Sequence, residues 1–185
     1  MSELNQLLRN IEQAESSSLA RKDWQPSHSG VIDIRIASDG TWYHEGRAFR
    51  RESLTRLFAS VLRKEEDKYY LLTPTEKLSI HVDDAPFVAT MLETYNENGQ
   101  QALVFTTNFG DKIVADSQHL IRVEIDAATG KPRPYIHFRD GLDALISRTA
   151  FFDLANMAET IERDGRMHLT VSSMGVDFDL GCADE

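Results

Sequence analysis

One order of secondary-structure signals occurs twice along the chain, and this repeat constrains the fold more than any other feature. In each half, two runs of alternating apolar residues precede an amphipathic helix pattern, and two further runs follow it. The apolar positions correspond in register, because Leu57 and Leu154 in the two helix patterns lie 97 residues apart. In the last strand, Ile80 and Phe178 lie 98 residues apart. We expect a duplicated β-β-α-β-β unit, the alternative being two unrelated amphipathic units that align equally well.

The first half begins with a helix pattern and continues with strands. Leu4, Leu7 and Ile11 form one apolar stripe on the first helix. Asp39-Gly40 marks the turn between the first two strands, because glycine adopts a positive φ at no steric cost. The expected elements are helices over residues 4–14 and 54–62 and strands over residues 32–36, 41–44, 70–72 and 78–82.

The second half opens with strands and then repeats the earlier pattern. We expect a helix over residues 151–161 and strands over residues 87–95, 101–107, 112–115, 121–125, 135–138, 167–171 and 176–180. The elements together predict an α+β fold with mostly antiparallel sheets. Its expected parts are an N-terminal helix over residues 1–23, an N-terminal α+β domain over residues 24–84 and a C-terminal domain over residues 85–185.

Charge and composition exclude several classes of partner. The chain of 185 residues has a formal net charge of −10 and a pI near 5.0, which argues against nucleic acid polymers and anionic membranes as partners. The longest apolar runs are far short of the roughly 20 residues that span a bilayer. The sequence shows no secretory signal, and Cys182 is the single cysteine. We therefore expect a cytoplasmic protein.

The signatures of common enzyme classes are missing. The sequence contains no glycine-rich dinucleotide or Walker motif, no zincin motif, no nucleophile elbow and no pair of cysteines. The six histidines are scattered singly, without the spacing of a metal site, and Cys182 is expected to be a bystander. We expect no enzymatic activity, no cofactor and no metal. A small hydrolase would need a nucleophile or general base beside the arginines, and the sequence shows no such pairing.

Positive charge collects at two matched places in this acidic chain. Residues 46–64 contain six basic residues and one acidic residue, and a smaller basic cluster precedes the helix of the second half. Arg51 and Arg148 correspond in register, and each lies just before a helix, where the helix dipole disfavours a cation. An arginine beside unpaired helical N–H groups is a good receptor for phosphate. The alternative is ordinary ion pairing of Arg51 with Glu52, and of Arg148 with Asp143 or Asp153.

Six further residues complete the predicted ligand site. Trp42 and Tyr135 are candidates for stacking against a base or another planar group, and their alternative role is core packing. The polar candidates lie in turns or on polar faces of strands, where their alternative roles are turn formation and solvated charge. These polar candidates are Asn108, Arg122, Glu76 and Arg139.

Several short motifs resemble the bacterial family called domain of unknown function 1285. The motifs that carry the resemblance are residues 40–42, 72–77, 82–87, 105–111, 134–135, 142–145 and 173–175, together with Arg51 and Arg148. They extend from about Asp39 to Gly181. The resemblance implies a two-domain core that arose by duplication, with a C-terminal domain similar to the pleckstrin-homology fold. It also implies a nucleotide-type ligand at the domain interface and a role in signal transduction, and it carries over no catalytic residues.

The sequence thus favours a non-enzymatic, ligand-binding module. The expected ligand is a nucleotide-like or phosphorylated small molecule between the two domains, with Arg51 and Arg148 on its phosphate. The alternative is a protein-protein interaction adaptor without a small-molecule ligand, in which a sheet edge or groove of the C-terminal domain receives a partner peptide by strand addition.

Overall fold

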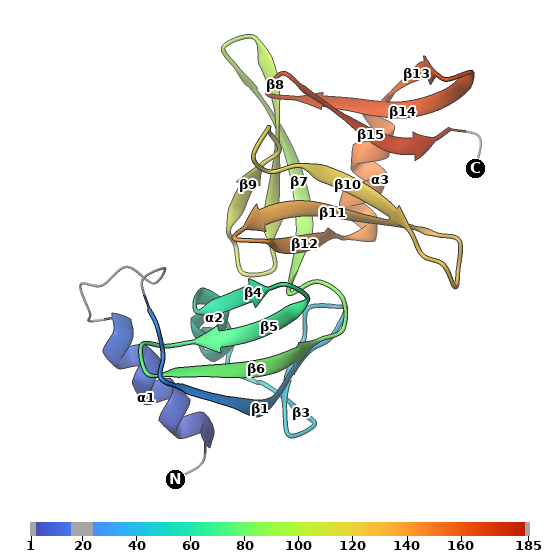
Figure 1. Cartoon of the computed structure of the whole chain (residues 1–185). Helices are drawn as coiled ribbons and strands as arrows, with labels where there is room; N and C mark the ends of the chain where they lie inside the picture. The colour runs from blue at the N-terminus through green and yellow to red at the C-terminus, as the bar shows by residue number, and fades with distance from the viewer. Residues whose placement is uncertain (1–2, 16–23, 184–185) are drawn as a thin grey trace. The chain divides into compact units, whose positions relative to one another are not determined.

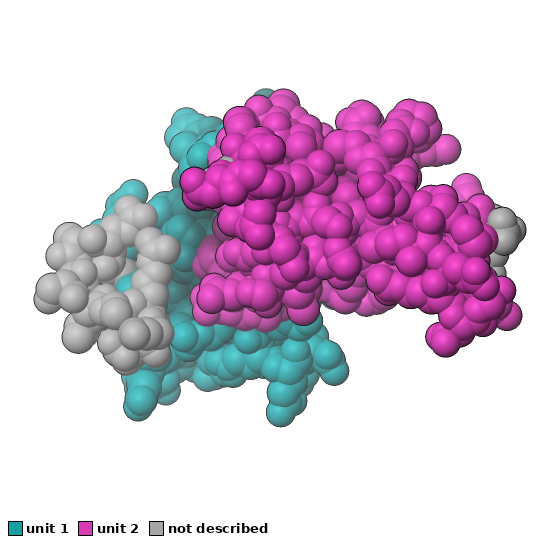
Figure 2. Space-filling model, turned by 90° about the horizontal axis from the view of Figure 1, so that it is seen from above, with its two compact units in different colours: residues 1–84 teal, residues 85–185 magenta. Residues whose placement is uncertain are grey.

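The chain folds into two compact units, each built mostly from curled β-sheet. The computed structural model describes residues 3–15 and 24–183 (Figure 1). Unit 1 comprises residues 1–84 and unit 2 residues 85–185, coloured teal and magenta in Figure 2. No helix in the described ranges is long and apolar enough to span a membrane.

Unit 1 is a single six-stranded sheet with two helices. Its elements are α1 (Glu3–Glu15), β1 (His28–Ile36), β2 (Trp42–His44), β3 (Arg47–Ala48), α2 (Glu52–Ser60), β4 (Leu62–Glu65), β5 (Lys68–Leu72) and β6 (Glu76–Val82). The strand order is β3-β2-β1-β6-β5-β4, in which β1 and β6 are parallel and the other neighbours are antiparallel. A parallel pair needs a crossover connection, and here the crossover contains α2.

The core of unit 1 follows the predicted periodicity. Ile32, Ile34 and Ile36 are buried on one face of β1 and alternate with exposed residues, as expected for a strand with one solvated face. Leu7 and Ile11, four residues apart on α1, are fully buried. The residues on the inner faces of the helices and of the strands therefore share one core.

Unit 2 contains two sheets and one helix. Its elements are β7 (Phe87–Glu97), β8 (Gln100–Thr107), β9 (Lys112–Val114), β10 (Ile121–Ile125), β11 (Pro132–Arg139), β12 (Leu142–Ile146), α3 (Arg148–Asn156), β13 (Glu159–Arg163), β14 (Arg166–Ser173) and β15 (Val176–Cys182). The larger sheet has the order β10-β11-β12-β7-β8-β9, with β12 parallel to β7. The smaller sheet has the order β13-β14-β15.

Ser173 joins the two sheets of unit 2. Its buried hydroxyl accepts a hydrogen bond from Leu103 N at 2.9 Å and donates one to Ala115 O at 2.6 Å. Next to it, Met174 N donates to Gln101 O at 2.8 Å. The end of β14 is thereby attached to β8 of the larger sheet.

The structure corrects the predicted β-β-α-β-β unit, because three strands rather than two precede each helix and three rather than two follow it. The additional strands are β3, β4, β12 and β13. Most of them form hairpins with their neighbours through turns at positive φ, as at Asp140-Gly141 and Asp164-Gly165. Both units therefore have the order β-β-β-α-β-β-β around their helix, which is consistent with two related units.

Both internal helices begin and end earlier than predicted. α2 ends at Ser60, and Val61 N bonds to Phe58 O in a tightened last turn. α3 ends at Asn156, so Ile161 lies in β13 rather than on a helix. The apolar residues after each helix continue its spacing by coincidence, because they belong to the strand that follows.

Candidate functional site

Arg51 occupies the N-cap position of α2. Its backbone is extended, with φ −105° and ψ 108°, and no side chain caps the helix. The exposed guanidinium forms no ion pair with any other residue in the described ranges. Glu52, the expected partner, pairs instead with Arg56 at 2.9 Å. The local ion pair between Arg51 and Glu52 is therefore absent.

Arg148 is the first residue of α3, and Ser147 is its N-cap. Ser147 Oγ accepts a hydrogen bond from Ala150 N at 3.2 Å, which satisfies one of the unpaired N–H groups of the first turn. Asp143, an expected partner of Arg148, binds Arg122 at 2.9 Å and His137 at 3.3 Å. Over the part of the chain that the structure describes, Arg148 forms no ion pair with Asp143 or Asp153. Its exposed guanidinium is open to a ligand.

A groove of about 920 Å³ surrounds Arg148. Its lining comes from the start of β11, the end of β12 and one face of α3. Arg148, Phe151, Phe152 and Ala155 share that face, because residues three, four and seven positions apart lie on one side of a helix. Lys131 and Arg133 are the other cations of the groove, and its lining within the described chain includes no aspartate or glutamate. The groove thus combines positive charge with an apolar surface.

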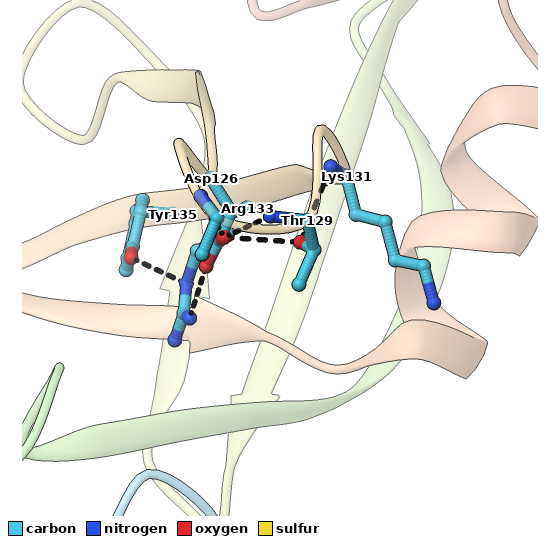
Figure 3. A network of polar contacts seen from close by, with 6 residues as sticks. Asp126, Thr129, Lys131, Arg133 and Tyr135 are labelled. Carbon is cyan, nitrogen blue, oxygen red and sulfur yellow. Dashed lines mark hydrogen bonds and ion pairs between the residues drawn. The ribbon is translucent and has the colours of Figure 1, made fainter.

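Arg133 is already neutralised by a network in the β10–β11 hairpin (Figure 3). Its guanidinium contacts Asp126 at 3.1 Å, and its Nε donates to the Tyr135 hydroxyl at 3.2 Å. The Thr129 backbone N–H, together with Arg133, lowers the pKa of Asp126 to about 2. Figure 3 shows the Lys131 side chain extending away from this network. Lys131 and Arg148 are therefore the groove cations for which the described residues supply no ion-pair partner.

The side chains of Arg122 and Tyr135 lie together, but they contact each other and neighbouring protein groups. The Arg122 guanidinium lies 4.6 Å from the centre of the Tyr135 ring, and Tyr135 is only 5% exposed. Arg122 also binds Glu124 and Asp143, each at 2.9 Å. Burial lowers the pKa of Arg122, but the bonds to these two carboxylates outweigh burial, so the pKa is raised overall. The structure does not support a stacking role for Tyr135 or a ligand contact for Arg122.

Trp42 is also a core residue. It is 2% exposed, and its ring is stacked against Phe58 with the centroids 6.2 Å apart. The prediction that Trp42 stacks against a ligand is wrong, because both aromatic rings are covered by the unit 1 core.

The last three predicted residues have structural contacts. Asn108 Oδ1 accepts from Val88 N at 3.1 Å, so this side chain holds the turn after β8 against β7. Glu76 accepts a hydrogen bond from the Asn10 side chain on α1. The Arg139 guanidinium lies over the Phe138 ring, 5.3 Å from its centre. The contact of Asn108 matches its alternative role in turn formation, whereas Glu76 and Arg139 contact neighbouring side chains rather than solvent alone.

The two predicted phosphate-binding arginines are thus exposed, whereas the predicted stacking residues Trp42 and Tyr135 are buried. Trp42, Arg51 and Glu76 belong to unit 1, and the other candidates belong to unit 2. The joint contact of Arg51 and Arg148 with one ligand stays a prediction. Sequence reasoning missed Phe152, which is 65% exposed beside Arg148. The sequence pattern that could have identified Phe152 is an aromatic residue four positions after Arg148, on the same face of the helix.

Comparisons with known proteins identify relatives of both units. The model described as the DUF1285 N-terminal domain, a domain of unknown function, matches residues 21–85, and the model of the DUF1285 C-terminal domain matches residues 86–180. The crystal structure of a DUF1285 family protein from Silicibacter pomeroyi is 43% identical, with a TM-score of 0.84 and coverage of 96% of each chain.

A second crystal structure supports the fold. This DUF1285 family protein from Shewanella baltica is 24% identical, with a TM-score of 0.54, and the alignment covers 66% of this chain and 90% of that one. No curated protein matches the chain.

Proposed function

We propose a function for this chain from the premise that it belongs to the DUF1285 family: it is a non-enzymatic module that binds a phosphorylated, nucleotide-like small molecule through the groove of unit 2. The observation that carries the proposal is the position of Arg148. Its guanidinium lines the groove beside Lys131, no acid lines the described groove, and neither cation is paired with a carboxylate in the described ranges. Two cations without a carboxylate partner in a shared groove attract an anion.

The phosphate would lie at the start of α3. The planar guanidinium of Arg148 can donate two hydrogen bonds to two phosphate oxygens, which an ammonium group cannot do in the same geometry. Thr149 lines the same groove and adds a hydroxyl. The helix dipole favours a negative charge at this end of α3. An anion here would therefore offset the unfavourable placement of a cation at a helix N-terminus.

The body of the ligand would lie on the apolar part of the groove. Phe152 is 65% exposed, and Phe151 and Pro132 line the groove with it, so the groove presents an apolar surface beside its cations. A nucleobase has a planar face that packs on such a ring. A ligand with a phosphate at one end and a planar or apolar body matches both parts of the groove.

We extend the proposal to the role of the protein. Unit 2 has two sheets that are largely antiparallel and a single helix, which supports a pleckstrin-homology-like arrangement. A non-enzymatic binding module suits signal transduction, in which ligand occupancy is the output. Contact of the same ligand with Arg51 of unit 1 stays a prediction, and the Arg51→Ala variant tests it.

Calorimetric titration of the full chain tests the proposal. The probes are adenosine and guanosine mono-, di- and triphosphates, cyclic nucleotides and inorganic pyrophosphate. We expect Arg148→Ala to weaken the binding of the best nucleotide by about ten- to a hundred-fold, because a hydrogen bond to a charged group is worth about 1.5–3 kcal/mol. Arg166→Ala removes the same charge from an exposed position outside the groove and is the matched control.

Two results would contradict this function. The first is that no nucleotide binds to the wild type or raises its melting temperature. The second is that Arg148→Ala and Arg166→Ala weaken binding equally, since binding would then depend on overall charge and not on the groove.

One observation favours the adaptor as a second candidate. β13 is an edge strand of the smaller sheet, and all five of its residues are exposed. An edge strand offers unpaired backbone groups to which a partner peptide can add as a further strand. Capture of one stoichiometric protein partner by the nucleotide-free chain, with no nucleotide binding, would favour this candidate.

A further inference from the structure

A thiol, an imidazole and a carboxylate form a row on β14 and β15. His168 and Cys182 are directly opposite each other in the antiparallel register. Cys182 Sγ lies 3.8 Å from His168 Nε2, and His168 Nδ1 lies 2.8 Å from Asp179 Oδ2. The imidazole thus lies between the only thiol of the chain and a carboxylate.

A β-bulge brings Asp179 into this row. Leu169 pairs with Gly181, but Thr170 pairs with Asp179, so Leu180 is an extra residue on β15. A regular register would place Leu180 opposite Thr170, on the face that His168 shares. The bulge replaces the leucine with a carboxylate on that face. Gly181 supports the bulge with φ 112° and donates its N–H to Asp179 Oδ1 at 2.8 Å.

The contacts determine which nitrogen of His168 faces the thiol as a base. A carboxylate accepts hydrogen bonds, so His168 Nδ1 carries the proton that is donated to Asp179. In the neutral imidazole, Nε2 then has a free lone pair toward Sγ and can accept the thiol proton. Asp179 and its neighbour Arg163, whose guanidinium lies 3.6 Å from Asp179 Oδ2, are the charged groups that contact this pair. The same order of groups activates the nucleophile in cysteine and serine enzymes.

The row borders an apolar groove that is separate from the groove at Arg148 in most of its lining. This second groove has a volume of about 850 Å³ and lies between β10, α3 and β15. Cys182, His168 and Asp179 line it together with apolar side chains, among them Ile121, Phe151 and Leu180. A molecule that reacts with the thiol would therefore have an apolar part.

We propose that Cys182 accepts an acyl group from an acyl thioester whose hydrocarbon chain occupies this second groove. His168 Nε2 takes the proton of Cys182, and the thiolate attacks the thioester carbonyl carbon. The new carbon–sulfur bond forms, the bond to the original thiol breaks, and the leaving thiolate takes the proton from His168. The products are S-acylated Cys182 and a free thiol, so no oxidant or reductant is needed. The expected bystander role of Cys182 is replaced by that of an acyl acceptor.

Mass spectrometry of the intact chain tests this proposal. The full chain is incubated with octanoyl-coenzyme A at neutral pH, and the added octanoyl group is followed over time and by its release with hydroxylamine. We expect one octanoyl group, at Cys182, added at least ten times faster than to the same chain unfolded in urea. Cys182→Ser should abolish the addition, because the chain has no other thiol.

Two variants test the role of His168 and Asp179. His168→Asn should slow octanoylation by about a hundred-fold, in the range of a lost general base, and Asp179→Asn should slow it less. His81→Asn, on β6 of unit 1, is the matched histidine control and should react at the wild-type rate. Thermal melting of each variant shows that it is folded. The pH dependence of iodoacetamide alkylation should shift in His168→Asn, which a purely structural histidine would not cause.

Chain length tests the groove. Acetyl-coenzyme A presents the same thioester without a hydrocarbon chain, so we expect it to react at least ten times more slowly than octanoyl-coenzyme A. Equal rates for the two thioesters would overturn the assignment of the groove to an acyl chain. An octanoylation rate that is no faster than in urea, or that is unchanged in folded His168→Asn, would overturn the proposal as a whole.

Discussion

The two units repeat one order of elements but close their sheets differently. In unit 1, β1 and β6, the first and last strands of the repeat, pair in parallel and complete one sheet. Their counterparts in unit 2, β10 and β15, lie beside each other without pairing, because the larger sheet of unit 2 is completed through β12 and β7. The second groove of unit 2 lies where unit 1 has a row of backbone hydrogen bonds. Because the larger sheet of unit 2 continues into β7–β9, β10 and β15 stay unpaired with each other, and the second groove lies between them.

The N-termini of α2 and α3 also differ between the two units. α2 begins after Arg51 with no side-chain cap, whereas Ser147 caps α3 and Arg148 is moved one residue into the helix. Because Ser147 caps α3, Arg148 is not the N-cap residue of its helix. Four predictions test this comparison.

The largest effect is expected in the two cores. Phe58 in unit 1 and Phe105 in unit 2 are fully buried, and replacing either with alanine should cost about 3–5 kcal/mol of unfolding free energy. Because each unit has its own core, we expect Phe58→Ala to reduce amide-exchange protection in residues 24–84 and Phe105→Ala to reduce it in residues 85–183. Equal loss in both units from either variant would show that they unfold as one.

The connection between the two sheets of unit 2 is tested by Ser173→Ala. This change leaves Leu103 N and Ala115 O without their partner in a buried place, at a cost of about 1–3 kcal/mol. Ser172→Ala removes the neighbouring hydroxyl from an exposed position and is the control. Urea unfolding measures both, and equal stabilities would contradict a role for Ser173 in joining the sheets.

The helix caps are expected to respond in opposite directions. Ser147→Ala should destabilise the chain by about 1 kcal/mol, because Ala150 N loses its acceptor. Arg51→Ser supplies a cap that α2 lacks and should stabilise unit 1 by a similar amount. Chemical denaturation followed by amide exchange assigns each change to its unit. A destabilised Arg51→Ser variant would indicate that Arg51 has a structural partner.

The smallest effect concerns the aspartates at corresponding hairpins. Hydrogen bonds from the Thr129 backbone and Arg133 hold the pKa of Asp126 at about 2, and the Thr41 backbone lowers the pKa of Asp39 in unit 1. A lowered pKa stabilises the fold above the ordinary value of 3.8, and this contribution fades as the pH falls from 3.8 toward about 2. Asp126→Asn should therefore weaken the acid dependence of urea unfolding more than Asp39→Asn. The reverse order would contradict the hydrogen-bond network at Asp126.

The sequence predicted most strands and the position of each helix, because alternation and helical spacing follow from which face is buried. The short strands were missed although Asp140-Gly141 and Asp164-Gly165 mark their turns, since strands of two to five residues give little alternation. The helix ends were placed too late because Leu62 and Ile161 fit the helical spacing while belonging to strands.

The candidate site was less predictable, and the reasons are physical. Arg148 could be found because a cation at a helix entry breaks a local rule. Trp42 and Tyr135 could not be separated from exposed aromatic residues, because burial depends on tertiary packing. The row of Cys182, His168 and Asp179 depends on a bulge that shifts one residue, and Phe178 and Leu180 give a regular alternation across it.

The central claim is that the groove at Arg148 binds a phosphorylated ligand, and amide chemical-shift mapping by nuclear magnetic resonance tests it most directly. Titration with adenosine triphosphate, or with whichever nucleotide binds best in calorimetry, should shift the amides of residues 147–152 and of Lys131. The same titration of Arg148→Ala should leave these amides largely unmoved. Shifts confined to other parts of the chain, or none at saturating nucleotide, would contradict the claim.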